Sequence, residues 1–183
     1  NSDVLVNIDL NQVFHLHNTT GQKITVVYKK LPKELISDVN SILEIDESDK
    51  VLGHELFQGG DKEVYNMSID IFVVDTPFLI EKLEEEAAKE EPRKLRYVLR
   101  DLAVAENAFA YEYTGYLSNI HSVKAYFDSN LDMLESEKFY KLFAPNQKVY
   151  TKVKNEEPTY YAASSDVKVS QFASGSLVRG KVD

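Results

Sequence analysis

The side chains able to do acid–base or metal chemistry in this sequence are carboxylates and histidines, because the chain contains no cysteine. A disulfide framework, a thiolate metal site and a cysteine nucleophile are therefore excluded. His15 and His17 stand two positions apart in a predicted helix, so they point to different faces and make a poor metal pair. Asp9 opens that helix, where N-capping is a sufficient explanation for a carboxylate.

Polar residues elsewhere have ordinary structural explanations when they are taken one at a time. Asn119 lies in a turn, where Asn is common because it tolerates left-handed backbone. His121, close to it, is interpreted as a hydrogen-bonding residue rather than a base or ligand. Ser68 lies on a predicted strand, where a packed hydroxyl is the usual role. The tyrosines from 111 to 126 fall at strand and helix periods and are interpreted as core and interface.

Composition excludes several classes of protein. The chain has 183 residues, with 30 acids against 21 bases and a formal charge of −9, which disfavours nucleic acid and anionic membranes as partners. No apolar run approaches the ~20 residues of a membrane span, and the N-terminus lacks the parts of a signal peptide. We therefore expect a cytoplasmic protein.

The elements that would position these residues alternate between strand and helix. A strand at 4–8, a helix from Asp9 to about Asn18 and a strand at 23–30 predict a βαβ unit with a parallel strand pair. Asp9 and Gln12 have the spacing of a capping box. Strands at 41–46 and 50–57 are joined by a polar turn, and a continuous apolar run predicts a central strand at 65–74.

The second half of the predicted domain is more helical. Thr76 and Pro77 predict the N-cap and first residue of a helix. The acidic run at 84–91 is interpreted as a solvated helix face rather than a recognition site. Further helices are predicted after Pro92, after Ser122 and at 136–143, with a strand at 108–113. This alternation predicts an α/β domain with a mostly parallel or mixed sheet over residues 1–143.

The sequence pattern changes after residue 143. Residues 144–165 contain two prolines and no helical period, which predicts an extended connector. In 166–183, Phe172 and Val178 are six apart, as are Ser176 and Val182, with glycines between them. A six-residue period of aliphatic and small residues is typical of a left-handed parallel β-helix, so 166–183 is predicted to form its first coils.

Several stretches together resemble one enzyme family. "DVLVNIDL" is similar to that family's "DHIYKMDY", "MSIDIFVV" to "ASMGIYVF", and "GYLSNIHSVKAYFDSNLDML" to "GYWRDVGTIESYWEANLDL". The family that these stretches resemble is the glucose-1-phosphate adenylyltransferases. Within it, the sequences "KVYTKVKNEEPTY" and "SQFASGSLV" are most similar to the GlgD-type subunit. The resemblance implies the C-terminal part of a Rossmann-like nucleotidyltransferase domain, in a fragment that lacks the N-terminal Gly-rich nucleotide-binding loop.

The family's metal site is matched at one of two positions. The family holds Mg²⁺ with two carboxylates; Asp3 matches the first, and Asn119 stands where the second should be. An amide oxygen is a weak, neutral ligand for Mg²⁺. The resemblance therefore implies a vestigial metal position at Asp3, no catalytic residue at Asn119, and no Mg²⁺ bound by the fragment.

The substrate positions depart from the family as well. The sugar-phosphate lysine of "F-x-E-K-P" has no counterpart in "HELFQGGD". Ser68 matches a sugar-contacting serine, but the family's nearby glycine is Asp70 here, and "HDFGKDIIP" survives as Arg100 and Asp101. Ser68 and Asp101 remain the candidates for substrate binding.

The matched and the substituted positions together predict a regulatory or weakly catalytic subunit of glucose-1-phosphate adenylyltransferase in glycogen biosynthesis. Its expected partner is a catalytic adenylyltransferase subunit, in a hetero-oligomer, or a second copy in a homo-oligomer; a sugar phosphate or nucleotide sugar is the ligand class. One alternative is an active sugar-phosphate nucleotidyltransferase with a rearranged metal site that uses Asp70 or Asp101. Another is an effector-sensing or oligomerisation module built on the β-helix coils.

Overall fold

The computed structural model describes residues 3–183, and the chain divides into two compact units, Asn1–His121 and Ser122–Asp183. The elements of the first unit are β1 (Val4–Val6), α1 (Leu10–Thr20), β2 (Ile24–Pro32), a 3₁₀ turn (Lys33–Leu35), β3 (Ser41–Ile45), β4 (Val51–Leu56), β5 (Val64–Val74), α2 (Thr76–Ala87), α3 (Leu95–Ala105), β6 (Phe109–Glu112) and β7 (Leu117–Asn119).

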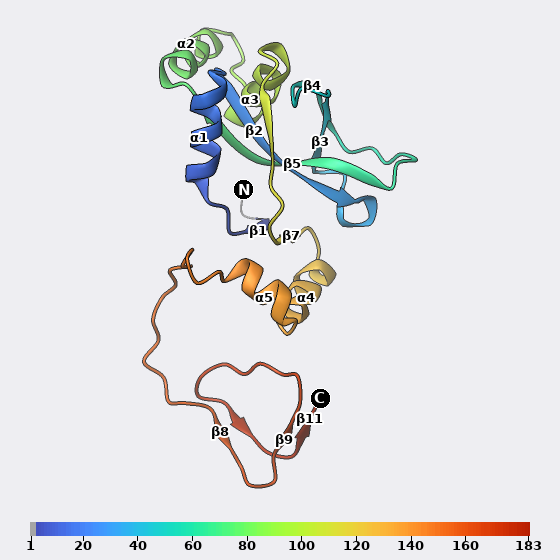
Figure 1. The fold of residues 1–183 in the computed structure, drawn as a ribbon, viewed down its shortest axis with the longest axis vertical. Helices are drawn as coiled ribbons and strands as arrows, with labels where there is room; N and C mark the ends of the chain where they lie inside the picture. Colours follow the sequence, from blue (N-terminus) through green and yellow to red (C-terminus); the bar gives the residue numbers. More distant parts are fainter. Residues whose placement is uncertain (1–2) are drawn as a thin grey trace. The chain divides into compact units, whose positions relative to one another are not determined.

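A mixed five-stranded sheet in the order β4-β3-β5-β2-β6 forms the centre of the first unit. β2 and β6 are parallel, and the other neighbours are antiparallel. In Figure 1 β2 and β5 cross the middle of this unit, and the β3–β4 hairpin lies on the side away from α1. The predicted α/β class, the mixed sheet and the central position of the 65–74 strand are thereby confirmed.

The sheet buries both of its faces. On one face Val13 of α1 and Leu117 of β7 pack with Val27 and Met67 of the sheet, and on the other Ala103 of α3 joins a second apolar cluster. Val13 has no exposed surface, and burial of such a side chain contributes about 1.5–3 kcal/mol. Helices on both faces explain why β2 and β5 are apolar on both sides.

Helix α1 begins and ends as its sequence predicts. Asp9 is the N-cap and accepts a hydrogen bond from the backbone of Asn11 at 3.0 Å, and Gly21 ends the helix with a left-handed φ of 60°. The predicted capping box is wrong in one respect: Gln12 does not return to the N-cap, and its side-chain oxygen accepts from the Tyr111 hydroxyl at 3.2 Å.

The predicted pairing of the first two strands is wrong. β1 does not pair with β2 but lies antiparallel to β7 in a separate two-stranded sheet, with Val4 opposite Asn119. The parallel neighbour of β2 is β6, which comes from the far end of the unit. Apolar periodicity predicts that a strand exists, but it carries no information about which distant strand becomes its partner.

A β-bulge interrupts β5 beside β2. Tyr28 pairs with Ser68, whereas Val27 pairs with Ile71, so two residues of β5 have no partner between them. The second of these, Asp70, has a positive φ of 54°. A bulge of this kind re-aims the side chains on either side of it.

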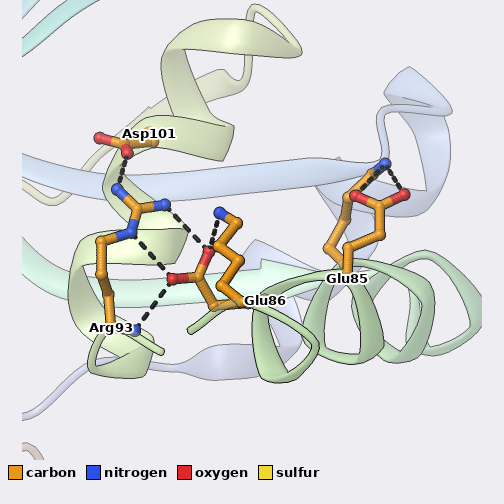
Figure 2. A network of polar contacts seen from close by, with 6 residues as sticks. Glu85, Glu86, Arg93 and Asp101 are labelled. Carbon is orange, nitrogen blue, oxygen red and sulfur yellow. Dashed lines mark hydrogen bonds and ion pairs between the residues drawn. The ribbon is translucent and has the colours of Figure 1, made fainter. Parts of the chain in front are cut away.

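Helix α2 differs from its prediction at both ends. The helix begins at Thr76, so Asp75 and not Thr76 is the N-cap, and its carboxylate binds His17 instead of capping. Within the acidic run, Glu86 is 5% exposed rather than solvated. Its carboxylate accepts two hydrogen bonds from Arg93 at 2.9 Å, one each from the backbone and Nε, and another from Lys89 (Figure 2). The run is therefore a solvated face everywhere except at this buried carboxylate.

The second unit contains two helices and two pairs of short parallel strands. The helices are α4 (Val123–Asp132), which Ser122 caps, and α5 (Ser136–Leu142). β8 (Tyr160–Tyr161) pairs with β10 (Leu177–Val178), and β9 (Asp166–Val167) pairs with β11 (Lys181–Val182). The chain thus returns parallel to itself, and Phe172 packs edge-on against Tyr161 with ring centroids 6.0 Å apart.

None of the helices in residues 3–183 combines the length and apolar character that crossing a bilayer requires.

Replacing Glu86 tests whether the contacts of this buried carboxylate in Figure 2 stabilise the junction of α2 and α3. Hydrogen bonds from Arg93, and then from Lys89, hold the pKa of the Glu86 carboxyl well below its usual range. A carboxyl with a depressed folded-state pKa stabilises the fold above its ordinary pKa of about 4.3, and that stability is lost as the pH falls. We expect Glu86→Gln to lower the urea midpoint at pH 7, with a smaller difference at pH 4. Glu85→Gln, which removes an exposed partner of Lys82, is the matched control and should change little. Equal effects of the two variants would contradict the buried role.

Candidate functional site

The small β1–β7 sheet places Asp3 and Asn119 at adjoining ends of its strands. The backbone N–H of Ile120 donates to the Asp3 carbonyl at 2.6 Å, beside the pairing of Val4 with Asn119. Asn119 is 6% exposed. The two residues that match the family's metal ligands are therefore held by neighbouring backbone positions.

The side chains of this pair do not fit a magnesium ion held by two carboxylates. Within the described residues, Asp3 Oδ1 and Asn119 Oδ1 are buried oxygens without a hydrogen-bond partner, and oxygen is the right ligand type for a hard cation. Asn119 is neutral, however, and its Nδ2 is engaged by Leu35 O at 2.9 Å and Asn40 Oδ1 at 2.7 Å. Residues 3–183 contain no cluster of three His, Cys, Asp or Glu side chains that could hold a metal. One carboxylate is left to compensate a divalent charge.

Ser68 and Asn119 belong to different sheets, Ser68 to β5 of the main sheet and Asn119 to β7 of the two-stranded sheet. Ser68 is opposite Tyr28, a member of the cluster under α3, whereas Asn119 follows Leu117, a member of the cluster under α1. The Ser68 hydroxyl is buried and accepts a hydrogen bond from the backbone of Asp70 at 3.3 Å. The Ser68 hydroxyl is therefore engaged within β5, although Ser41, which pairs with Ser68, directly follows the Asn40 that binds Asn119.

Asp70 forms the main ion pair on that second face. Both of its carboxylate oxygens lie 3.1 Å from a terminal nitrogen of Arg100, and one lies 3.5 Å from Arg96. The side chains of Asp70 and Arg100 are 15% and 8% exposed. Asp70 occupies the position of the family's glycine and keeps a left-handed φ, which Asp tolerates better than most residues. The carboxylate is thus neutralised from within the chain.

Asp101, the other predicted substrate residue, points away from the sheet. Its carboxylate accepts from Arg93, and the same guanidinium holds Glu86, as Figure 2 shows. The Asp101 side chain is 64% exposed. Ser68 and Asp101 therefore lie on different elements in different surroundings and do not form one site.

His54 of β4 is a buried group that its sequence context does not single out. Both ring nitrogens are buried, and neither has a hydrogen-bond partner among the described residues. Burial, and then the positive charge of Arg100, lowers the pKa of His54 to about 4. The ring stacks on Phe72 at 6.2 Å. Alternation along β4 does not signal this position, because a register shift between Val51 and Gly53 brings His54 opposite Leu43, a member of the cluster under α3.

The remaining histidines are structural or exposed. His17 is buried and connects α1 to two other elements, with Nδ1 2.8 Å from Thr25 Oγ1 and Nε2 3.2 Å from Asp75. Since a carboxylate only accepts, Nε2 is the donor in the contact with Asp75. His15 and His121 are exposed.

In residues 54–61, the segment that lacks the family's lysine, Gly60 lies against the Tyr65 side chain. A Cβ at Gly60 would lie 2.2 Å from the Tyr65 hydroxyl, so a larger residue here would have to displace the Tyr65 ring. The same hydroxyl accepts from the backbone of Lys62 at 3.2 Å. Lys62, the first lysine after this segment, lines a hollow together with Glu44 and Glu55.

Comparison with known proteins identifies relatives of the chain. No family model matches it. It is 30% identical over 129 residues to the glycogen biosynthesis protein GlgD of Bacillus subtilis. The matched region covers 70% of this chain and 36% of that protein. It is 24% identical over 184 residues to the glucose-1-phosphate adenylyltransferase of Clostridium acetobutylicum, a match that covers 98% of this chain and 48% of that protein. It is also 24% identical over 190 residues to the glucose-1-phosphate adenylyltransferase of Thermosipho africanus, a match that covers 98% of this chain and 44% of that protein.

The chain belongs to the glucose-1-phosphate adenylyltransferase family. Its similarity to GlgD confirms the resemblance on which the residue matches depend. The chain spans between about a third and a half of the length of these curated relatives. Within this adenylyltransferase-family chain, the matched polar positions are the ones found in internal hydrogen bonds and ion pairs: Asn119 with Asn40, Asp70 with Arg100, and Asp101 with Arg93.

A double-mutant cycle tests the pairing of Asp70 with Arg100. Asp70→Asn keeps a residue that tolerates the left-handed backbone but removes the charge. Breaking a buried pair from either side costs about 3–5 kcal/mol, because the other charge stays buried. We expect Asp70→Asn and Arg100→Met each to lower the free energy of unfolding by that order in urea titrations, and the double variant to lose clearly less than the sum. Additive losses would contradict the coupling.

His54 predicts a specific acid sensitivity. A histidine with a pKa of about 4 in the fold and about 6.5 when unfolded disfavours folding once it must be protonated. Stability is therefore full above pH 6.5 and is lost as the pH falls toward 4, by about 3 kcal/mol. We expect His54→Phe, which keeps the stacking on Phe72, to unfold at a higher urea concentration than the wild type at pH 5. The exposed His15→Phe variant serves as the control, and an unchanged difference between pH 7.5 and pH 5 would refute this role of His54.

Proposed function

We propose that this chain acts in glycogen biosynthesis as part of a regulatory, GlgD-like subunit that tunes a catalytic glucose-1-phosphate adenylyltransferase subunit. In the assembled enzyme, ATP and glucose 1-phosphate would give ADP-glucose and pyrophosphate, with the chemistry done by the partner. The proposal includes a cytoplasmic hetero-oligomer and no Mg²⁺ held by this chain. It also includes a Rossmann-like first unit and a left-handed β-helix that begins in the second.

The observation that carries the proposal is the loss or internal neutralisation of charge at the family's ligand positions. A nucleotidyltransferase must present free cations and metal-bound charge to polyanionic substrates. Here the Asp70 and Arg100 charges neutralise each other, and the metal position offers Asn119 in place of a carboxylate. Loss of one preorganised charge stabiliser costs roughly 10²–10³ in kcat, so several losses together support a non-catalytic role.

The same contacts weigh against an active enzyme with a rearranged metal site. Asp70 and Asp101 are the carboxylates that could replace the missing ligand, but Arg100 and Arg93 hold them on the second face and on the outer side of α3. A metal there would have to displace a guanidinium from each. The regulatory role requires no such rearrangement.

The deciding experiment is ADP-glucose formation by the full-length protein alone, by its catalytic partner alone, and by the mixture. We expect no measurable turnover by the protein alone, and a changed rate or substrate affinity in the mixture. A second mixture should contain the partner with its metal-binding carboxylates replaced by alanine, and it should be inactive. Turnover in that second mixture, or by the protein alone, would mean that the substituted site is functional.

A further inference from the structure

The amide of Asn119 sits between two hydrogen-bond acceptors. Its Nδ2 lies 2.9 Å from the Leu35 carbonyl oxygen and 2.7 Å from Asn40 Oδ1. Both asparagines are 6% exposed. The contact therefore joins β7 to the segment before β3 in a place shielded from water.

The chemistry of the partners determines which end of each amide faces the other. A backbone carbonyl only accepts, so the group that faces Leu35 O must be the NH₂ of Asn119. A backbone N–H only donates, so the group of Asn40 that faces Ser37 N at 2.9 Å must be the oxygen. That oxygen also accepts from the Ser37 hydroxyl at 2.9 Å. Asn119 is thus a donor and Asn40 an acceptor, with no alternative orientation.

The backbone of Asn40 extends this contact to a third segment. Its carbonyl accepts from the N–H of Phe57, which directly follows β4, at 2.9 Å, and its N–H donates to the Ser37 carbonyl at 3.0 Å. A substitution at Asn119 would therefore disturb hydrogen bonds that also hold the turn before β3 and the residue that follows β4.

We propose that position 119 is a positioning residue that must donate hydrogen bonds, and that it excludes the metal-binding carboxylate which the family carries there. A carboxylate at 119 would place an acceptor oxygen where Nδ2 now donates to both Leu35 O and Asn40 Oδ1, and its charge would be buried. Asn119 is therefore a part of a rearranged hydrogen-bond network rather than a simple loss of a ligand. This inference goes beyond the proposed function, because it holds for an active or a regulatory subunit.

The test is a pair of single-atom exchanges with opposite expected signs. Asn119→Asp replaces the donor by an acceptor, whereas Asn40→Asp strengthens an acceptor that already receives three hydrogen bonds. Asn130→Asp is the matched control, because Asn130 is exposed and donates to the Tyr126 carbonyl at 2.7 Å in α4. Urea unfolding of each variant should be followed between about pH 4 and pH 8, with and without MgCl₂, around the ordinary Asp pKa of about 3.9.

We expect Asn119→Asp to lower the urea midpoint at pH 7.5 and to recover part of it at pH 4. The acid form can still donate, so the folded state raises the pKa of the new carboxyl, and stability is lost as the pH rises through it. Asn40→Asp should show the reverse trend, because donors favour the charged form. Mg²⁺ should move neither midpoint.

Two results would overturn the proposal. One is an Asn119→Asp variant that is as stable as the wild type, or that Mg²⁺ stabilises while it leaves Asn130→Asp unchanged, because the carboxylate would then be accepted as a metal ligand. The other is an Asn40→Asp variant with the same pH trend as Asn119→Asp. If Asn119→Asp does not fold at pH 7.5, its midpoint at pH 4 and the trend of Asn40→Asp still decide the question.

Discussion

The antiparallel pairing of β2 with β5 is the contact on which the first unit depends. It joins a strand from the start of the chain to one from its middle, and the other strands add to its two sides. Its register breaks between Val27 and Tyr28, and this break lets β5 carry Asp70 toward α3 with a left-handed backbone. A sheet that paired regularly here would have no place for the carboxylate that meets Arg100.

The arginines of α3 and of the loop before it have carboxylate partners. Arg100 faces Asp70, and Arg93 bridges Glu86 and Asp101. A surface that binds phosphates keeps some of its cations free to meet the ligand, and these guanidiniums already have carboxylate partners. The same residues that stabilise the packing of α2 and α3 thus reduce the attraction for an anion. Stability and a weaker attraction for anions thus have a common physical cause at this helix.

Local sequence patterns predicted most elements, and they failed where a contact came from far along the chain. The β3–β4 hairpin, the helix after Ser122 and the end of α1 at Gly21 follow from periodicity, capping and turn chemistry. The partner of β1 could not be predicted, since β7 lies more than a hundred residues away. The burial of Glu86 was missed for a related reason: an acidic run has no periodic signal that marks the one member with a guanidinium partner.

The candidate positions came from the family resemblance, but their chemistry came from the folded chain. Nothing local indicates that the Asn119 amide faces two acceptors, because Leu35 and Asn40 are brought to it by the turn before β3. Asp70 was more accessible to prediction. A glycine in the matching position signals a positive φ, and Asp is among the residues that tolerate one.

The ion pair over the bulge also restricts the order in which this lineage could have changed. An aspartate introduced at position 70 before a cation faced it would combine a strained backbone with an unpaired buried charge. A cation already present at position 100 would make the same substitution acceptable at once. After both were in place, a return to glycine at 70 would leave Arg100 without a counterion. Each residue of the pair is therefore costly to lose alone, so the two are expected to be kept or exchanged together.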